Sequence, residues 1–85
     1  MATEYQFAKL FEISKGGKEY QVLVERITNE EEYSAVRVST DVGFLVQQEA
    51  EYDDDTTRDN RFDTFTETKA EEFLNSMLKL ASIQD

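Results

Sequence analysis

Hydrophobic and polar residues alternate through residues 5–13 and again through residues 20–27. An alternation with a period of two is typical of strands that bury one face. Gly16 and Gly17 stand between the two stretches, where a two-residue hairpin loop requires positive φ angles. The pattern therefore predicts an antiparallel β-hairpin near the start of the chain.

The same two glycines determine which residues face each other across this hairpin. Because successive side chains point to opposite faces of a strand, a slip by one residue would exchange the two faces. With the loop at the glycines, the apolar residues of both strands fall on matching faces, so pattern and loop agree. The predicted pairs are Ile13 with Tyr20, Phe11 with Val22 and Lys9 with Val24 on one face, and Leu10 with Leu23 on the other.

A second pair of alternating stretches follows at residues 33–40 and 44–52. Between them, residues 41–43 resemble a three-residue hairpin loop with Gly43 at the left-handed position. Two hairpins in succession predict a four-stranded antiparallel meander. The predicted pairs in the second hairpin are Val38 with Val46 and Thr40 with Phe44.

Residues 67–82 change to a helical period. Apolar residues recur here every three or four positions and charged residues occupy the other side, which predicts an amphipathic helix. Thr68 and Glu71 have the spacing of a capping box, and Thr66 is an alternative N-cap. The apolar stripe consists of Ala70, Phe73, Leu74, Met77, Leu78 and Ala81.

We expect this helix to pack on one face of the sheet, because its apolar stripe needs a partner surface. The predicted fold class is α+β, a single domain in which a four-stranded antiparallel meander is followed by one C-terminal helix, in the order ββββα. The residues expected to face the helix are Phe7, Phe11, Ile13, Val22, Val24, Val36, Val38, Phe44 and Val46.

Residues 53–64 connect the last predicted strand to the helix and are rich in Asp, Thr, Asn and Arg. Phe62 is the one apolar residue among them, so the segment is predicted to be a solvated acidic loop. Its carboxylates Asp55, Asp59 and Asp63 offer oxygen ligands to a divalent cation. The segment lacks the glycine and the bidentate glutamate of an EF-hand calcium loop, so we expect weak cation binding at most.

The 85-residue chain contains no His and no Cys. Without an imidazole base or a thiolate nucleophile, most acid–base and nucleophilic mechanisms are excluded, and we expect neither enzyme activity nor a cofactor. The N-terminal residues show no basic segment followed by an apolar run, and no stretch of about 18 apolar residues occurs. The chain is therefore expected to act in the cytoplasm, away from membranes.

The net charge of the chain indicates which kinds of partner it can bind. The chain has 19 acidic and 9 basic residues, which gives a formal net charge of −10. Because nucleic acids and anionic lipids are bound mainly through Lys and Arg, direct binding to either is not expected. The expected partner is a protein with a basic or apolar surface. The acidic surface expected to contact it consists of Glu49, Glu51, Asp53, Asp54, Asp55, Asp59, Asp63 and Glu67.

An apolar patch on the other side of the sheet offers a second contact. Leu10 and Leu23 face each other in the predicted register, and Leu45 lies on the same side of its own strand. One helix covers only one face, so these leucines are expected to be exposed together among polar residues. Such a patch can bind a partner protein or a second copy of the chain.

These features predict a non-catalytic interaction or regulatory module that binds a basic or apolar partner surface. The alternative is a nucleic-acid mimic that inhibits a DNA- or RNA-binding protein, as small mobile-element inhibitors do. Glu49 and Glu51 would then contribute carboxylates about 7 Å apart on one strand face. Weak divalent-cation binding is the third hypothesis.

Overall fold

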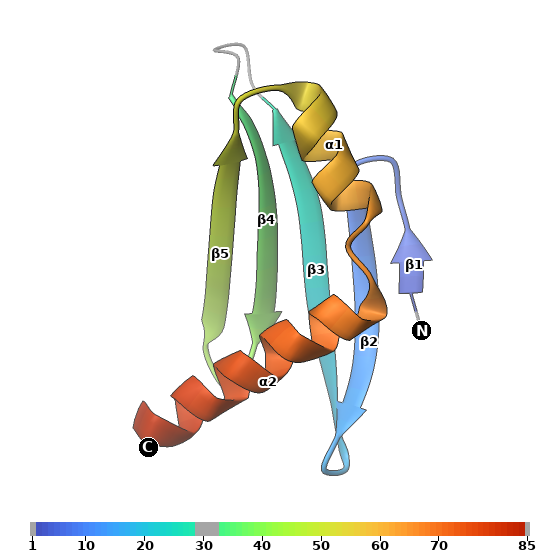
Figure 1. Ribbon diagram of the computed structural model, residues 1–85. Coiled ribbons are helices and arrows are strands. Elements are labelled where there is room, and N and C mark those ends of the chain that lie inside the picture. Colours follow the sequence, from blue (N-terminus) through green and yellow to red (C-terminus); the bar gives the residue numbers. More distant parts are fainter. Residues whose placement is uncertain (1, 29–32, 85) are drawn as a thin grey trace.

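The computed structural model describes residues 2–28 and 33–84, the last two of these by their backbone alone. Its α+β class and antiparallel sheet agree with the prediction, but the described residues form five strands and two helices instead of four strands and one helix. The strands follow one another in the order β1-β2-β3-β4-β5, and both helices lie on the same face of the sheet (Figure 1). The elements are β1 (Ala2–Glu4), β2 (Ala8–Lys15), β3 (Lys18–Thr28), β4 (Ser34–Asp41), β5 (Leu45–Tyr52), α1 (Asp55–Asp63) and α2 (Glu67–Gln84).

The first hairpin, β2 and β3, has the predicted register. Gly16 and Gly17 form its loop with φ angles of 57° and 81°, in the left-handed region that glycine enters without steric cost. The glycines of the turn and the apolar alternation of the strands thus indicate the same register. The observed pairs include Ile13 with Tyr20, Phe11 with Val22, Lys9 with Val24 and Leu10 with Leu23.

In the second hairpin, β4 and β5, the predicted register is wrong by two residues. Asp41 remains in its strand and pairs with Leu45, so the loop is formed by the three residues 42–44. The Asp41 carboxylate holds this loop, because its Oδ1 accepts the Gly43 N–H at 2.9 Å. Phe44 therefore leaves the expected core and is 41% exposed. The observed pairs are Val38 with Gln48 and Thr40 with Val46.

The N-terminal strand predicted for residues 5–13 begins too early, because residues 5–7 form a turn between β1 and β2. The Tyr5 N–H donates to the Ala8 carbonyl at 2.7 Å, and the turned chain pairs β1 with β2. Phe7 lies in this turn and is 55% exposed, so its predicted place in the core is also wrong. The Arg26 guanidinium instead lies over the Phe7 ring, with its Cζ 5.3 Å from the ring centroid.

The predicted acidic loop of residues 53–64 is for the most part the helix α1. Asp54 is its N-cap and accepts the Thr57 N–H at 2.6 Å, which satisfies one of the free donors of the first turn. Phe62 lies in the core with 3% of its surface exposed. Lys9 of β2 donates from Nζ to the Phe62 carbonyl at 2.8 Å and to the Asp63 carbonyl at 3.1 Å, which fixes the helix end to the sheet.

The C-terminal helix α2 begins after Thr66, the alternative N-cap, and the capping box at Thr68 is not formed. The Lys69 N–H donates to the Thr66 hydroxyl at 3.4 Å, and the Ala70 N–H donates to the Thr66 carbonyl at 3.0 Å. Ala70 and Leu74 of the predicted stripe are fully buried. The other stripe residues, Phe73, Met77, Leu78 and Ala81, are half-buried.

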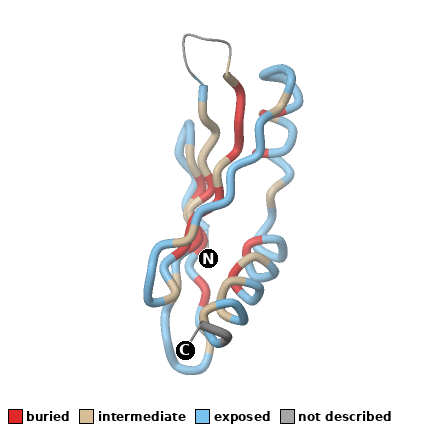
Figure 2. The backbone as a smooth tube through the Cα atoms, turned by 90° about the vertical axis from the view of Figure 1, so that its left-hand side faces the viewer, coloured by how far each residue is buried: buried red, intermediate tan, exposed pale blue. Residues whose placement is uncertain are grey.

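The core consists of buried side chains of the sheet and of both helices, and Figure 2 shows the buried segments of the sheet and the helices in red. In the strands its residues come from alternate positions, so the opposite positions form a face that no helix covers. The core side chains are Phe11, Ile13, Val22, Val24, Val36, Val38, Phe62, Ala70 and Leu74.

Candidate functional site

The helix-free face of the sheet brings together the three leucines that the sequence singled out. Leu10 faces Leu23 across β2 and β3, and Leu23 faces Ser39 across β3 and β4. Leu45 pairs with Asp41 on the same side of the sheet. Together these residues line an open hollow of about 670 Å³, which we call the leucine hollow.

The floor of the leucine hollow is apolar but only partly covered. Leu10 and Leu23 are half-buried, whereas Leu45 is 65% exposed on the hairpin end of β5. Ser39, between these leucines, is buried. A small side chain between larger ones produces a depression in the sheet surface, so the leucines surround a recess that a partner side chain can enter.

Carboxylates predominate on the helix-free face; Glu19 and Asp41 are among the residues that line the leucine hollow, as is the basic residue Lys18. The strand register places six carboxylates on the helix-free face, against Arg37 as the one basic residue among the described strand positions there. The face is therefore predominantly acidic. The six carboxylates belong to Glu12, Glu19, Glu25, Asp41, Glu49 and Glu51.

Arg37 neutralises part of this acidic face. Its guanidinium lies 3.1 Å from Glu25 on β3 and 3.9 Å from Glu49 on β5, so three neighbouring strands share one row of charges. Glu49 also accepts the Tyr33 hydroxyl, and this hydrogen bond raises the pKa of Tyr33 above its usual value. Asp41 and Glu51, at opposite ends of the face, have no ion pair among the described residues.

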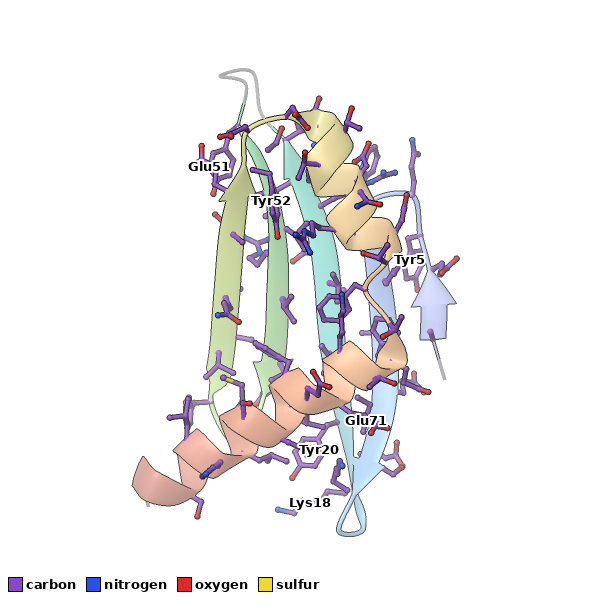
Figure 3. All side chains as sticks on the ribbon, viewed as in Figure 1. Tyr5, Lys18, Tyr20, Glu51, Tyr52 and Glu71 are labelled. Carbon is purple, nitrogen blue, oxygen red and sulfur yellow. The ribbon has the colours of Figure 1, made fainter. Side chains whose placement is uncertain are left out.

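The acidic surface predicted from residues 49–67 does not form one continuous patch. Glu49 and Glu51 lie on the helix-free face, and Figure 3 shows Glu51 on the far side of β5 from Tyr52. Asp53 and Asp54 lie in the connection to α1, where Asp54 caps the helix. The remaining four, Asp55, Asp59, Asp63 and Glu67, lie on the two helices.

Two of the helix carboxylates are engaged in internal ion pairs. Asp59 lies 3.2 Å from Arg26 and 2.9 Å from Arg58. Asp55 lies 3.5 Å from Arg58 and accepts the Ser34 hydroxyl. Because Arg58 is itself buried, these carboxylates compensate its charge and fix α1 to the sheet.

Asp55, Asp59 and Asp63 were also the candidate cation ligands. They recur four residues apart on α1, and Arg58 lies against the first two. Within the described ranges, no group of three or more His, Cys, Asp or Glu side chains is placed to hold a metal ion. The structure therefore offers nothing in support of the cation hypothesis.

Sequence reasoning did not include Glu19 and Asp41 in the candidate site. Glu19 lies four residues before Leu23 on β3, and the period of two places both on one face. That signal was present in the sequence. The sequence prediction places Asp41 in a loop, and only the observed pairing of Asp41 with Leu45 places it on the helix-free face.

Comparison with known proteins gives no family. No family model, curated protein or solved structure matches this chain. No helix in the described part of the chain is long and apolar enough to cross a membrane. The features that bear on function are therefore those of the surface itself, an apolar recess on a predominantly acidic sheet face.

Proposed function

We propose that this protein is a non-catalytic interaction module that binds a partner protein through its helix-free face. The observation that carries the proposal is the leucine hollow, in which Leu10, Leu23 and Leu45 lie on a sheet face that bears six carboxylates. The partner that fits it presents an apolar side chain flanked by Lys or Arg. Acidic surfaces of this kind favour basic partners and disfavour nucleic acids.

The two parts of the face contribute differently to binding. Complete burial of a leucine side chain is worth roughly 1.5–3 kcal/mol, so the partly exposed leucines can supply much of the affinity. Exposed ion pairs contribute only about 0–1 kcal/mol each. The carboxylates act mainly by accelerating the encounter with a basic partner and by rejecting acidic ones.

The same face supports a nucleic-acid mimic as a second candidate. Glu49 and Glu51 stand two positions apart on β5, on the side that carries Glu25 and Glu12. Side chains two apart on one strand face are separated by about 7 Å, a spacing suited to a basic groove that binds phosphates. The ion pairs of Arg37 with Glu25 and Glu49 reduce this charge at the centre of the face.

The proposed function predicts that Leu45→Asp abolishes capture of the partner. Purified protein serves as bait in an extract of its source cells, and retained proteins are identified by mass spectrometry. Leu45 is 65% exposed, so the substitution adds a charge to the recess without opening the core. Leu80→Asp is the matched control, because Leu80 is an exposed leucine on α2, on the other face.

Salt and nucleic acid separate the two candidate functions. A complex held by the leucine hollow persists in about 0.5 M salt, where the Debye length is only several ångströms. A mimic binds a nucleic-acid-binding protein, and duplex DNA or RNA displaces it. Equal capture by the wild type and by Leu45→Asp would contradict the interaction module.

A further inference from the structure

The outer edge of β5 is a free strand edge. β5 is the last strand in the order and pairs with β4 alone among the described residues. Its pairing runs without interruption from Asp41 opposite Leu45 to Ser34 opposite Tyr52, and the chain contains no Pro. Neither a bulge nor a proline therefore blocks this edge, and its backbone N–H and C=O groups can pair with another strand.

The helix side of β5 is also open. α1 and α2 lie over the other strands along much of the sheet, and the front of β5 stands clear between them in Figure 1. Gln48 and Ala50 are exposed although they point to the side of the core. Two hollows of about 370 and 390 Å³ adjoin there and share walls formed by Val38, Gln48, Phe65 and Lys69. We call this continuous space the β5 groove.

The β5 groove combines an apolar lining with two basic residues. Val36 and Val38 form its base, and half-buried aromatic residues of the helical segment form its wall. Arg61 and Lys69 line it as well, and neither has an ion pair among the described residues. Its acidic lining residues are Glu49, whose carboxylate lies on the other side of β5 beside Arg37, and Glu72 at the α2 end.

Arg61 and Lys69 belong to the basic residues without an ion pair among the described residues, as do Lys15, Lys18 and Lys79. Arg26, Arg37 and Arg58 each pair with at least one carboxylate, and Lys9 is bound by two carbonyls. In a chain with a net charge of −10, positive side chains without partners are attractive sites for an acidic ligand. The opposite side of β5 carries Glu49 and Glu51, so the two sides of this edge have opposite charge.

We infer that β5 accepts an extended segment of a partner protein as a sixth strand, with acidic and apolar side chains in the β5 groove and basic side chains beside Glu49 and Glu51. Main-chain hydrogen bonds supply affinity in such strand addition, and alternate side chains supply specificity. The recognised segment therefore alternates between lysine or arginine and acidic or apolar residues.

A second copy of this chain fits the edge less well. The groove-side residues of a second β5 would be Val46, Gln48, Ala50 and Tyr52, none of which is acidic. Arg61 and Lys69 would remain unpaired, and two molecules of charge −10 would approach each other. The charges thus favour a different chain that carries both signs.

The strand site is separate from the leucine hollow. The β5 groove opens on the helix side of the sheet, whereas Leu10, Leu23 and Leu45 lie on the helix-free side. A variant of Leu45 therefore tests the proposed function, and variants of Arg61 and Lys69 test the strand site. Failure of either proposal leaves the other standing.

The test uses a synthetic peptide with blocked ends and the sequence Lys-Val-Lys-Glu-Lys-Val-Lys-Glu. Isotope-labelled full-length protein is titrated with it, and affinity and amide hydrogen exchange are followed by NMR. We expect saturable binding and slower exchange at alternate amides of β5, where new strand hydrogen bonds form. Arg61→Glu combined with Lys69→Glu should weaken binding at least about tenfold, whereas Leu45→Asp, which adds a carboxylate on the side of Glu49 and Glu51, should not weaken it.

Two control peptides separate strand addition from simple charge attraction. The first has the same composition in the block order Lys-Lys-Lys-Lys-Val-Glu-Val-Glu, which removes the alternation. The second carries N-methyl groups on alternate residues and is made in both phases, of which one removes the donors that face β5 and the other removes those that face away. The block peptide and the first of these phases should bind at least about tenfold more weakly than the alternating peptide.

Several outcomes would overturn the proposal. These are absence of binding, equal binding of the block peptide, or binding without slower exchange in β5. Concentration-dependent dimerisation that protects the β5 amides without peptide would assign the edge to a second copy. Both cationic side chains are exposed, and circular dichroism of the double variant establishes that it is folded, so loss of binding reports on the groove.

Discussion

Asp54 shows how one side chain decides where an element begins. Its backbone is extended, with φ −147° and ψ 165°, and its carboxylate accepts the Thr57 N–H at 2.6 Å. Hydrogen bonds from the Thr57 backbone, and then from its side chain, lower the pKa of Asp54 below the usual value of 3.8. The ionised form is therefore the one that stabilises α1, as expected for an anion at a helix N-terminus.

Asp54→Ala should lower the midpoint of thermal unfolding at neutral pH, and Asp54→Asn should lower it less, because Asn keeps an acceptor. The folded-state pKa lies below the unfolded value, so the carboxylate stabilises fully above about pH 4 and loses its effect as pH falls through the folded-state pKa. The gap between the wild type and Asp54→Ala should thus narrow in strong acid. Circular dichroism melts from about pH 7 to about pH 2.5 provide the measurement, and a constant gap would contradict this account.

At the scale of the element, α1 depends on a single aromatic anchor. Phe62 is 3% exposed within the core, and the other helix residues are polar or charged. Lys9 binds the carbonyls at its end, and Asp59 joins it to Arg26 of β3. The helix is thus held by one buried ring and by polar contacts at both ends.

Phe62→Ala should therefore destabilise the protein by about 3 kcal/mol or more, the usual cost of removing a buried aromatic side chain. Phe44→Ala is the matched control, since Phe44 is 41% exposed in a loop, and it should cost well under about 1 kcal/mol. Urea unfolding followed by fluorescence and circular dichroism measures both. If both variants lost only a similar, small amount of unfolding free energy, the result would contradict the anchored helix and favour the solvated loop that the sequence predicts for residues 53–64.

The elements that the sequence predicted correctly are those whose signals are local. The glycine loop and the alternation of β2 and β3 agreed, and α2 has a long apolar stripe. α1 offered no stripe, because tertiary packing of Phe62 and ion pairs of Arg58 replace it. β1 has only three residues, too few to show a period.

The sequence also predicted some residues of the candidate site and missed others. Leu10 and Leu23 followed from the hairpin register, and Leu45 lies on the expected side of its strand. The register of β5 depended on a hydrogen bond from Gly43 to Asp41, which alternation does not reveal. The β5 groove could not be predicted, because its walls are set by the positions of two helices on the sheet and the sequence prediction had only one helix.

At the scale of the whole molecule, charge is distributed unevenly. Asp55 and Asp59 of α1 form ion pairs with Arg26 and Arg58. The uncompensated part of the net charge of −10 therefore lies at carboxylates without ion pairs in the described part of the chain, such as those of Asp41 and Glu51. Repulsion among such groups opposes the compact state and is screened by salt. Stability should therefore respond to ionic strength.

We expect the unfolding midpoint to rise when sodium chloride increases from about 20 to about 200 mM, because the Debye length then falls from roughly 20 to 7 Å. Asp41→Asn combined with Glu51→Gln should show a smaller rise, since it removes two carboxylates but keeps an acceptor for the Gly43 N–H. Calorimetry at both salt concentrations measures the shift. A midpoint that falls with salt would mean that ion pairs outweigh repulsion.

The short strand β1 affects how large any assembly can become. It covers β2 at Lys9, Leu10 and Phe11, while β5 presents an eight-residue edge at the other end of the sheet. A molecule with two long free edges can stack on copies of itself without limit, which is how fibrils grow. This chain has one such edge among its described strands, so copies that paired through β5 would leave only the short β1 edges outside, and the assembly would end at two molecules.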